Sequence, residues 1–367
     1  MSIREYLEQK RNVQSIIQEF LNYNETKPEQ LFQISNKFID IREICHLLIV
    51  IANFKYHNTD IYQKIEQIIL YLKNDITSAF SNADIYNIFQ NCKQILLILF
   101  ANDIITMDKA TINIILNTSD KNGTLHKHFF YPEIKGFLAE DESEEIKKQL
   151  YIIDPDIFIN FNEKRQKGEN DSILCSLIRD DSVNKFVLYT TETNILLSSN
   201  ITPSIFETNS LLLKRKSISL IEYAAFYGSI KIIQYLERKG VDLIQSMWIY
   251  AIHSNDIRLI HFFEDRQFFP DENMIFKLIK ESIKCHNDNF SDYFINNYLC
   301  CDNNLIHDHV IQDCMHYNNY LYLPDDFKTK LLFFYSCKYN YLDIVKILLN
   351  DKSNDIDIND TIVPNCF

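Results

Sequence analysis

Glycine and proline are scarce in this chain, which has five glycines and seven prolines among 367 residues. An all-β protein needs many more turn-forming residues, so the predicted fold class is all-α. The glycines stand at positions 123, 136, 168, 228 and 240, and no two are closer than 12 residues. This spacing excludes glycine-rich phosphate loops and the Gly-x-Ser-x-Gly elbow, and no His-Glu-x-x-His occurs. We therefore expect a non-enzymatic protein without a cofactor or a catalytic residue.

Basic residues and long apolar runs are also few. Lys and Arg number 37 against 50 Asp and Glu, a net charge of −13, and no basic stretch occurs. A phosphate backbone would repel such a chain, so nucleic acid is not an expected partner. The longest apolar runs, at 47–52 and 95–101, are too short to span a membrane, so a membrane is not an expected partner.

The cysteines and the first residues indicate a compartment. Nine cysteines, an odd number, are scattered between Cys45 and Cys366 without a disulfide framework. Free thiols suit a reducing environment, and the sequence after Met1 lacks the apolar stretch of a secretory signal. These features predict a cytoplasmic protein.

Apolar residues at helical spacing are abundant in the chain. Hydrophobic residues make up 46% of it. Apolar stripes in the N-terminal part predict a series of helices; they are Ile16, Ile17, Phe20 and Leu21, and then Ile61, Ile65, Ile68, Ile69 and Leu72. The acidic run 140–145 is expected to form the first turn of a helix. Phe129 to Pro132 is expected to be a turn or an extended segment.

One segment, Ser219 to Asp242, has the pattern of a helix, a tight reversal at Gly228 and a second helix ending at Gly240. A single hairpin of this kind cannot bury its own apolar face, so it predicts stacked neighbours. The pattern has a small pair before the glycine and an aliphatic pair after it: Ala224, Ala225, Gly228, Ile232, Ile233 and Leu236.

The same pattern returns further along the chain. It recurs as Ala251, Ile252, Asn255, Leu259, Ile260 and Phe263, and as Ser336, Cys337, Asn340, Ile344, Val345 and Leu348. Asn stands where a left-handed turn is needed, and Asn tolerates that conformation best after Gly. Weaker matches predict a fourth hairpin over 274–298, with its break at 286–288, and a fifth over 85–105 with Asn91 at the turn.

These residues resemble ankyrin repeats. Taken with the segments 169–171, 204–209, 220–225 and 248–253, they are similar to an ankyrin-repeat family that is expanded in parasitic protists. In that family the N-terminal helical region is a domain of unknown function. The resemblance implies an ankyrin-type helical solenoid that binds proteins and brings no catalytic residues. It suggests three parts: an N-terminal helical domain over 1–140, for which degenerate repeats are an alternative, a helical connector over 141–215, and ankyrin-like repeats over 216–367.

Two departures from the family pattern are informative. Ser219 to Glu222 replaces the usual Thr-Pro-Leu-His, and Ser219 with Glu222 predicts a capping box instead. At the C-terminus, residues 356–359 lead toward a further repeat, but the chain ends at Phe367, which predicts an incomplete last repeat: either a truncated array or an apolar end covered by another chain. An uncapped apolar end predicts self-association through that repeat.

Two sets of residues are candidates for a site. Side chains just before the turns face the concave surface of such repeats, which predicts protein binding by Phe226, Tyr227, His253, Ser254, Lys338 and Tyr339. For Phe226, internal packing is an equal alternative. The second set would make a zinc-stabilised binding module; it comprises Cys300, Cys301, His307, His309, Cys314 and His316. Its spacing differs from that of known zinc knuckles, so buried thiols and exposed imidazoles are preferred there, and no metal site is predicted. Trp248 is expected in the core.

Overall fold

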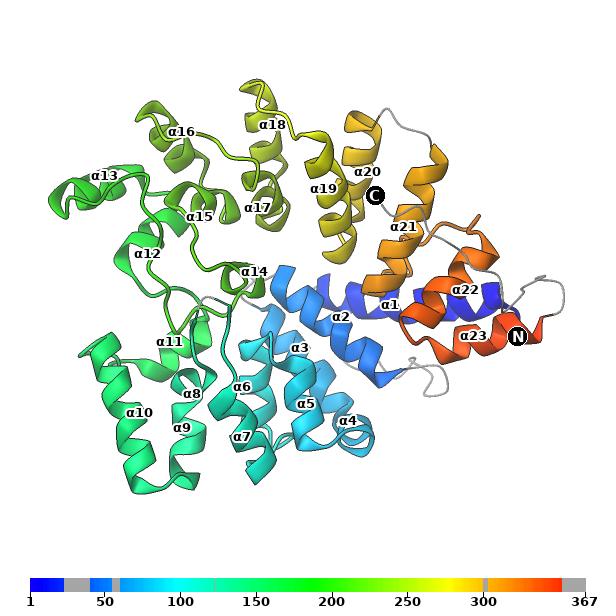
Figure 1. Ribbon diagram of the computed structural model, residues 1–367, viewed down its shortest axis with the longest axis horizontal. Coiled ribbons are helices and arrows are strands. Elements are labelled where there is room, and N and C mark those ends of the chain that lie inside the picture. Colours follow the sequence, from blue (N-terminus) through cyan, green and yellow to red (C-terminus); the bar gives the residue numbers. More distant parts are fainter. Residues whose placement is uncertain (23–39, 55–59, 122, 300–302, 352–367) are drawn as a thin grey trace. The chain divides into compact units, whose positions relative to one another are not determined.

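The computed structural model describes residues 1–22, 40–54, 60–121, 123–299 and 303–351 (Figure 1). These residues contain 23 α-helices and, within the described ranges, no β-strand, which confirms the all-α prediction. None of the described helices is long and apolar enough to cross a membrane. Residues 356–367, including the predicted lead into a further repeat, lie outside the described part.

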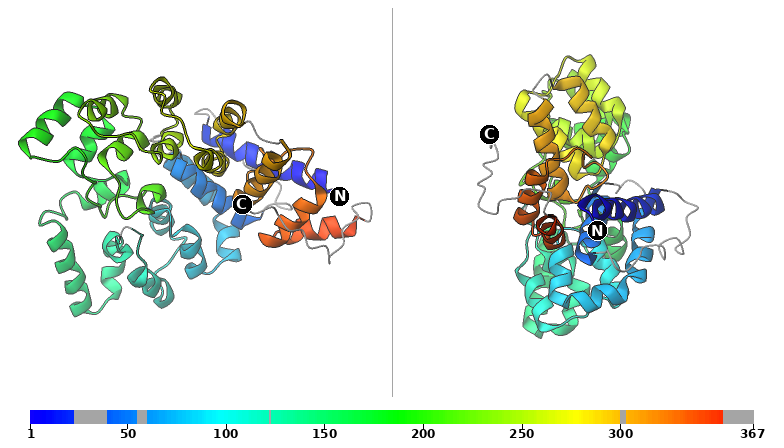
Figure 2. Two further views of the ribbon diagram at one scale, coloured as in Figure 1. Left: turned by 45° about the horizontal axis from the view of Figure 1, so that its top comes forward. Right: turned by 90° about the vertical axis from the view of Figure 1, so that its right-hand side faces the viewer.

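The chain packs as two compact units. Unit 1 combines residues 1–50 with residues 271–367, and unit 2 comprises residues 51–270. The N-terminal helix α1 (Ile3–Asn22) and the C-terminal helix α23 (Leu342–Asn350), blue and red in Figures 1 and 2, therefore belong to the same unit. This grouping does not follow the predicted boundaries at 140 and 216, which stay predictions.

The first part of unit 2 is a succession of short helices, as the apolar stripes predict. The buried side chains Ile61, Ile65, Ile68 and Ile69 belong to α3, which packs against α6. The helices are α3 (Ile61–Tyr71), α4 (Lys73–Ala79), α5 (Asn82–Phe89), α6 (Lys93–Ala101), α7 (Lys109–Asn117), α8 (His126–Phe129), α9 (Tyr131–Ile134), α10 (Glu140–Ile153) and α11 (Phe161–Lys167).

Three expectations for this part have clear outcomes. The acidic run does form the first turn of α10. The expectation of a turn or an extended segment over 129–132 holds only at Phe130, the turn between α8 and α9. It is wrong for Pro132, which lies in the first turn of α9, where its missing N–H is not needed. Helices α5 and α6 do form a pair, but Asn91 is not left-handed.

Five helix hairpins follow, three in unit 2 and two in unit 1. Those of unit 2 are α12 (Ile173–Arg179) with α13 (Val183–Glu192), α15 (Leu220–Phe226) with α16 (Ile230–Arg238), and α17 (Met247–Ser254) with α18 (Ile257–Asp265). The short α14 (Ser210–Leu213) precedes α15. Those of unit 1 are α19 (Glu272–Lys284) with α20 (Asp288–Tyr298), and α22 (Thr329–Lys338) with α23 (Leu342–Asn350).

Each hairpin reverses at one left-handed residue, with φ between 46° and 68°. Its backbone N–H donates to the carbonyl three residues back. In four of the five, the next N–H donates to the carbonyl five residues back, which completes the Schellman pattern of helix ends. The left-handed residues are Asp181, Gly228, Asn255, His286 and Asn340. The predictions for Asn255, Asn340 and the break at 286–288 are confirmed.

Neighbouring hairpins of unit 2 are joined by hydrogen bonds as well as by packing. Helix α15 packs against both α12 and α17. The Ser229 hydroxyl donates to the Ile178 carbonyl at 2.6 Å. The Asp181 carboxylate accepts the N–H groups of Lys231 and Ile232 at 3.2 and 3.0 Å, so the turn of one hairpin caps the second helix of the next. The predicted capping box of Ser219 and Glu222 is present at the start of α15.

Gly228→Ala is expected to lower the free energy of unfolding by about 1 to 2 kcal/mol, because a side chain in the left-handed conformation is strained. A Cβ at this position would meet the Ser254 Cβ at 3.5 Å, an ordinary contact, so strain is the main cost. Gly228→Asn should cost less. Gly136→Ala is the control, since Gly136 has no positive φ and its Cβ would meet open space. Equal losses for Gly228→Ala and Gly136→Ala in urea unfolding would contradict this account.

Two polar segments quoted for the family resemblance meet in unit 2. The Glu207 carboxylate is buried and accepts the backbone N–H groups of Asn170, Thr208 and Asn209 at 3.3, 3.0 and 2.9 Å. Burial raises the pKa of Glu207 to about 7, although the three backbone donors lower it. The Thr208 N–H also donates to the Gly168 carbonyl. These bonds hold the start of α12 beside the segment that leads into α14.

In unit 1 the N-terminal helix packs on the last hairpin. The remaining helices of this unit are α1 (Ile3–Asn22), α2 (Ile41–Phe54), whose last turn belongs to unit 2, and α21 (Asn303–Tyr317). Helix α1 packs against α23, in which Ile344 and Leu348 are buried. Arg11 donates to the carbonyls of Tyr320 and Leu323 at 2.9 and 2.7 Å. The chain's own helix thus packs against the last hairpin, and self-association through it stays a prediction.

Candidate functional site

The six residues predicted to bind a protein occupy the ends of the first helices α15, α17 and α22, directly before the turns. In unit 2, Phe226 is fully buried and His253 is 3% exposed. Their rings stack at 6.0 Å, and His253 also meets Phe54 at 6.1 Å. The alternative of internal packing therefore describes Phe226 in this structure, and neither side chain offers surface to a partner. Tyr227 and Ser254 are half-buried.

Lys338 and Tyr339 of unit 1 lie at a surface of another kind. The Tyr339 ring lies nearly parallel to the His316 ring at 4.8 Å and 10°, and His316 lies in the same way on Tyr317 at 4.4 Å and 13°. We call Tyr317, His316 and Tyr339 the aromatic stack. The Lys338 Nζ is 5.5 Å from the centre of the Tyr339 ring. The stack joins the end of α21 to the end of α22.

A groove of about 960 Å³ opens beside the aromatic stack, and all three of its rings line this groove. The other walls come from α1, α2, the α22–α23 turn and α23, through Tyr6, Arg42, His46, Ile49, Tyr341 and Ile347 among others. Its size is at the upper end of the range for ligand pockets, and aromatic side chains with a few polar groups are typical linings of binding sites. The groove is the candidate functional site of unit 1.

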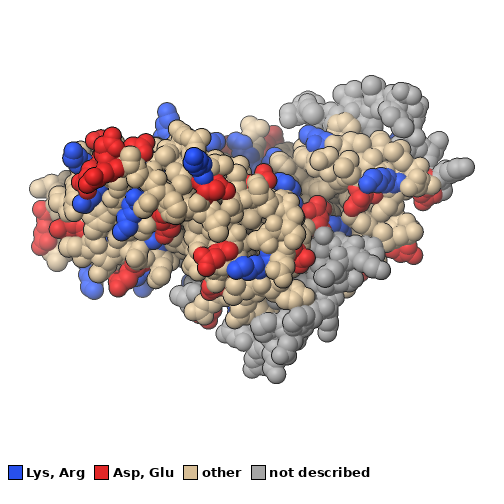
Figure 3. Space-filling model, turned by 90° about the horizontal axis from the view of Figure 1, so that it is seen from below, with Lys and Arg blue, Asp and Glu red and all other residues tan. Residues whose placement is uncertain are grey.

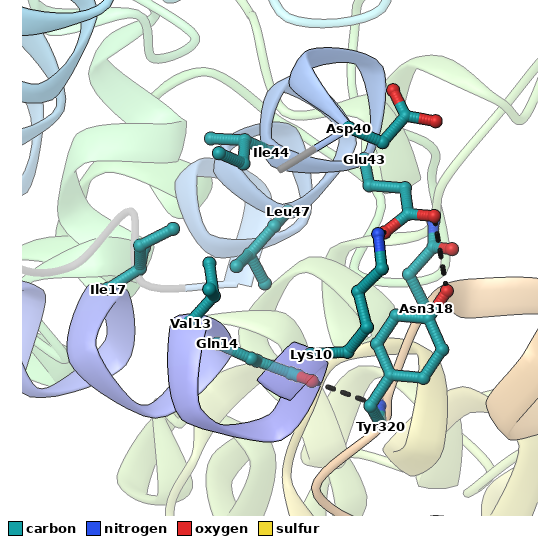
Figure 4. Close-up of a pocket in the computed structure, with 10 residues that line it drawn as sticks. All are labelled: Lys10, Val13, Gln14, Ile17, Asp40, Glu43, Ile44, Leu47, Asn318 and Tyr320. Carbon is teal, nitrogen blue, oxygen red and sulfur yellow. Dashed lines mark hydrogen bonds and ion pairs between the residues drawn. The ribbon is translucent and has the colours of Figure 1, made fainter. Parts of the chain in front are cut away.

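Two residues of the groove lining, Lys10 and Glu43, form a buried ion pair, and Figure 4 draws this pair in a smaller neighbouring pocket that it also lines. Lys10 of α1 is 6% exposed, and its Nζ lies 2.8 Å from Oε2 of Glu43 on α2. The Tyr320 hydroxyl donates to Oε1 of Glu43 at 3.3 Å, and the Tyr320 N–H donates to Gln14 at 2.9 Å. Burial lowers the pKa of Lys10, but the Glu43 carboxylate outweighs it, so that the pKa is raised. Lys10 is thus charged and already paired.

The imidazole of the aromatic stack is neutral at pH 7. Burial lowers the pKa of His316, and the positive charges of Lys280 and Lys338 lower it further. A neutral ring stacks on the two tyrosines without adding charge to the groove. The stack therefore presents polarisable ring faces and edges to whatever enters.

The described members of the Cys and His cluster that suggested zinc, His307, His309, Cys314 and His316, are spread along α21. His307 pairs with Asp326 at 2.8 Å, the His309 ring meets Phe276 at 5.7 Å, Cys314 is buried and His316 belongs to the aromatic stack. Among these four described side chains, no three bring ligand atoms together. Cys300 and Cys301 lie outside the described residues. The preference for a buried thiol is confirmed at Cys314.

Sequence reasoning found Lys338 and Tyr339 but missed the rest of the groove. The partners of Tyr339 in the aromatic stack, His316 and Tyr317, were weighed only as metal ligands or not at all. The α1 and α2 residues carry no motif, because their role depends on contacts with residues about 300 positions away. Trp248, expected in the core, is fully buried.

Comparisons with known proteins give no relative for this chain. No family model matches it, no curated protein matches it, and no solved structure matches it. The resemblance to an ankyrin-repeat family therefore stays a prediction, carried by the residues of the hairpins.

Proposed function

We propose that this chain is a non-enzymatic scaffold of the ankyrin type, which binds another protein through the concave face of its hairpin array. One observation carries the proposal: five hairpins reverse at a single left-handed residue, with the same backbone hydrogen bond. Repeated hairpins that bury their faces on one another leave long surfaces for partners, which is how most such arrays are used. The step of 27 residues between Gly228 and Asn255 leaves no room for long projecting loops, which favours binding by the helix ends.

Within this scaffold we assign the contact surface to the groove of unit 1. Of the predicted residues, Lys338 is exposed, and the half-buried Tyr339 lines the groove. Tyrosine is frequent among the residues that dominate binding energy at interfaces. The ring of the half-buried Tyr227 meets that of Tyr223 at 4.7 Å and an angle of 50°, which suits a supporting role.

Replacing Tyr339 is expected to abolish partner capture. Wild type, Tyr339→Ala and Tyr151→Ala would be compared for proteins cross-linked and recovered from lysate of the native cell. A central aromatic anchor costs about 2 kcal/mol or more when truncated, roughly a thirtyfold loss of affinity. Tyr151 is a matched control, because it is 45% exposed and belongs to α10 of unit 2. A partner recovered equally by all three proteins would place the binding surface elsewhere.

A further inference from the structure

We propose that a polar pocket of unit 2 binds a small phosphate monoester. The pocket has a volume of about 190 Å³ and lies where the end of α5, the connection from α7 to α8 and the helix α14 meet. Nine of its ten lining residues are polar, and the exception is Leu213. All ten belong to unit 2, so this site adds a ligand to the proposed scaffold function and does not depend on the groove of unit 1.

Asp120, the one carboxylate among the described lining residues, is already neutralised. Lys93 of α6 is 1% exposed, and its Nζ lies 2.6 Å from Oδ2 of Asp120. The Nε2 of His126 lies 3.3 Å from Oδ1 of Asp120, and its Nδ1 lies 2.7 Å from the Tyr86 hydroxyl. Burial lowers the pKa of His126, although the bond to Asp120 raises it. The imidazole is therefore neutral at pH 7, and the charges of Lys93 and Asp120 cancel.

Two further lysines in the lining leave the pocket positively charged. Lys121 directly follows Asp120, Lys214 is the C-cap of α14, and both side chains are exposed. Charges more than about 10 Å away are largely screened at physiological salt, so these two lysines act on a ligand more strongly than the chain's net charge of −13 does. On the face drawn in Figure 3, by contrast, acidic and basic side chains are interspersed. A local pair of positive charges suits a small anion better than an extended polyanion.

The walls of the pocket also offer hydrogen-bond donors that the protein does not use. Four lining side chains make no hydrogen bond within the described part of the chain: Gln90, Asn91, Ser119 and Ser210. Amides and hydroxyls both donate and accept, whereas lysine only donates, so the whole set has an excess of donors. A ligand rich in acceptor oxygens satisfies this excess.

Charge and size together select the ligand. A phosphate monoester carries about −1.5 to −2 charges at pH 7 and three strong acceptor oxygens, whereas a carboxylate has one charge and two oxygens. Ligand pockets for drug-sized molecules have about 300–1,000 Å³, so a pocket of 190 Å³ holds a phosphoryl group with few further atoms. Such a group can come from a small phosphorylated metabolite or from a phosphorylated side chain of a partner protein.

The test is isothermal titration calorimetry of the full chain in a phosphate-free buffer. The probes are glycerol phosphate, a Gly-Ser peptide with one phosphoserine, and acetate; we expect both phosphate probes to bind and acetate to bind much more weakly. Lys121→Gln and Lys214→Gln should each weaken the binding of the phosphate probes about five- to tenfold, because each removes a charge-assisted hydrogen bond. Lys185→Gln is the matched control, since it removes the same charge from an exposed position on α13 that does not line the pocket. Circular dichroism checks that each variant is folded.

The other outcomes are equally distinct. Absence of binding by both phosphate probes overturns the site, and acetate bound as tightly as glycerol phosphate overturns the choice of phosphate. Binding that both Lys121→Gln and Lys214→Gln leave unchanged, or that Lys185→Gln weakens equally, contradicts the pocket as its location. Binding of glycerol phosphate alone would support the pocket and identify a metabolite as the source, and binding of the peptide alone would support it with a phosphorylated partner. Partner capture through Tyr339 is measured separately, so either proposal can fail without the other.

Discussion

Phe226→Ala is expected to destabilise unit 2 by about 3 to 5 kcal/mol, the usual cost of removing a buried aromatic ring from a core. Phe226 has no exposed surface, and its ring lies 5.0 Å from that of Tyr227, 6.2 Å from that of Tyr250 and 6.0 Å from that of His253. Its helix α15 packs against α12, α16 and α17. The cavity would therefore open where three hairpins meet, and little of it is expected to close.

Trp248 makes this prediction measurable. It is the only tryptophan, it is fully buried, and it belongs to α17 of the same unit. Urea unfolding followed by Trp248 fluorescence should show a free energy of unfolding that is about 3 to 5 kcal/mol lower for Phe226→Ala. For Phe226→Leu the loss should be about 1 kcal/mol, because leucine fills more of the space than alanine does. Tyr151→Ala should show no loss. Unchanged stability of Phe226→Ala together with lost partner capture would mean that Phe226 faces the partner and that its burial here is wrong.

The hairpins could be predicted where the residue types at a turn or at a helix start determine the local backbone. Asn255 and Asn340 were found because asparagine tolerates the left-handed turn, and Ser219 with Glu222 because a capping box needs those two residue types. The hairpin that turns at Asp181 was missed and assigned to a connector. Its positions equivalent to the small pair hold Leu177 and Ile178, and aspartate is a less obvious left-handed residue than glycine or asparagine.

The groove could not be predicted, because no local pattern determines it. It exists because Arg11 and Gln14 of α1 bond to the segment around Tyr320, which brings the start of the chain against its last hairpin. The aromatic stack could not be predicted from a local pattern either. It depends on the packing of two helices, because His316 belongs to α21 and Tyr339 follows α22. Conversely, the cluster around Cys314 is close in sequence but not in space, since a helix turns by about 100° per residue and sends such side chains to different faces.

The second prediction with a large expected effect concerns the stability of unit 1 in acid. The free energy of unfolding is expected to fall by about 3 kcal/mol between pH 6.5 and pH 4 through one residue, His286. This left-handed residue joins α19 to α20 in unit 1. One ring nitrogen lies 2.7 Å from the Gln14 amide, and the other lies 3.1 Å from the Tyr317 carbonyl. A neutral ring accepts from the first and donates to the second. Only the bond from Gln14 needs the uncharged form, because a charged ring still donates to the Tyr317 carbonyl.

The sign of the effect follows from the pKa. Burial lowers the pKa of His286 from 6.5 to about 4, although the bond to the Tyr317 carbonyl raises it. Between these values the unfolded chain binds a proton that the folded chain does not, so acid favours unfolding. The stabilisation is complete above pH 6.5 and is lost as the pH falls toward 4. Carboxylates titrate in the same range, and a variant is needed to isolate the histidine.

His286→Asn is that variant, because asparagine accepts the positive φ of 53° at this turn and does not titrate. It should be less stable than wild type at pH 7, where it lacks the ring's bonds to Gln14 and Tyr317. Its stability should then fall by about 3 kcal/mol less than that of wild type on going from pH 6.5 to pH 4. Urea unfolding followed by circular dichroism at several pH values measures both, with His261→Asn, at an exposed position of α18, as the control. Parallel pH profiles for wild type and His286→Asn would show that this imidazole is not held neutral, and that the contact of α1 with the α19–α20 turn does not set the acid limit of unit 1.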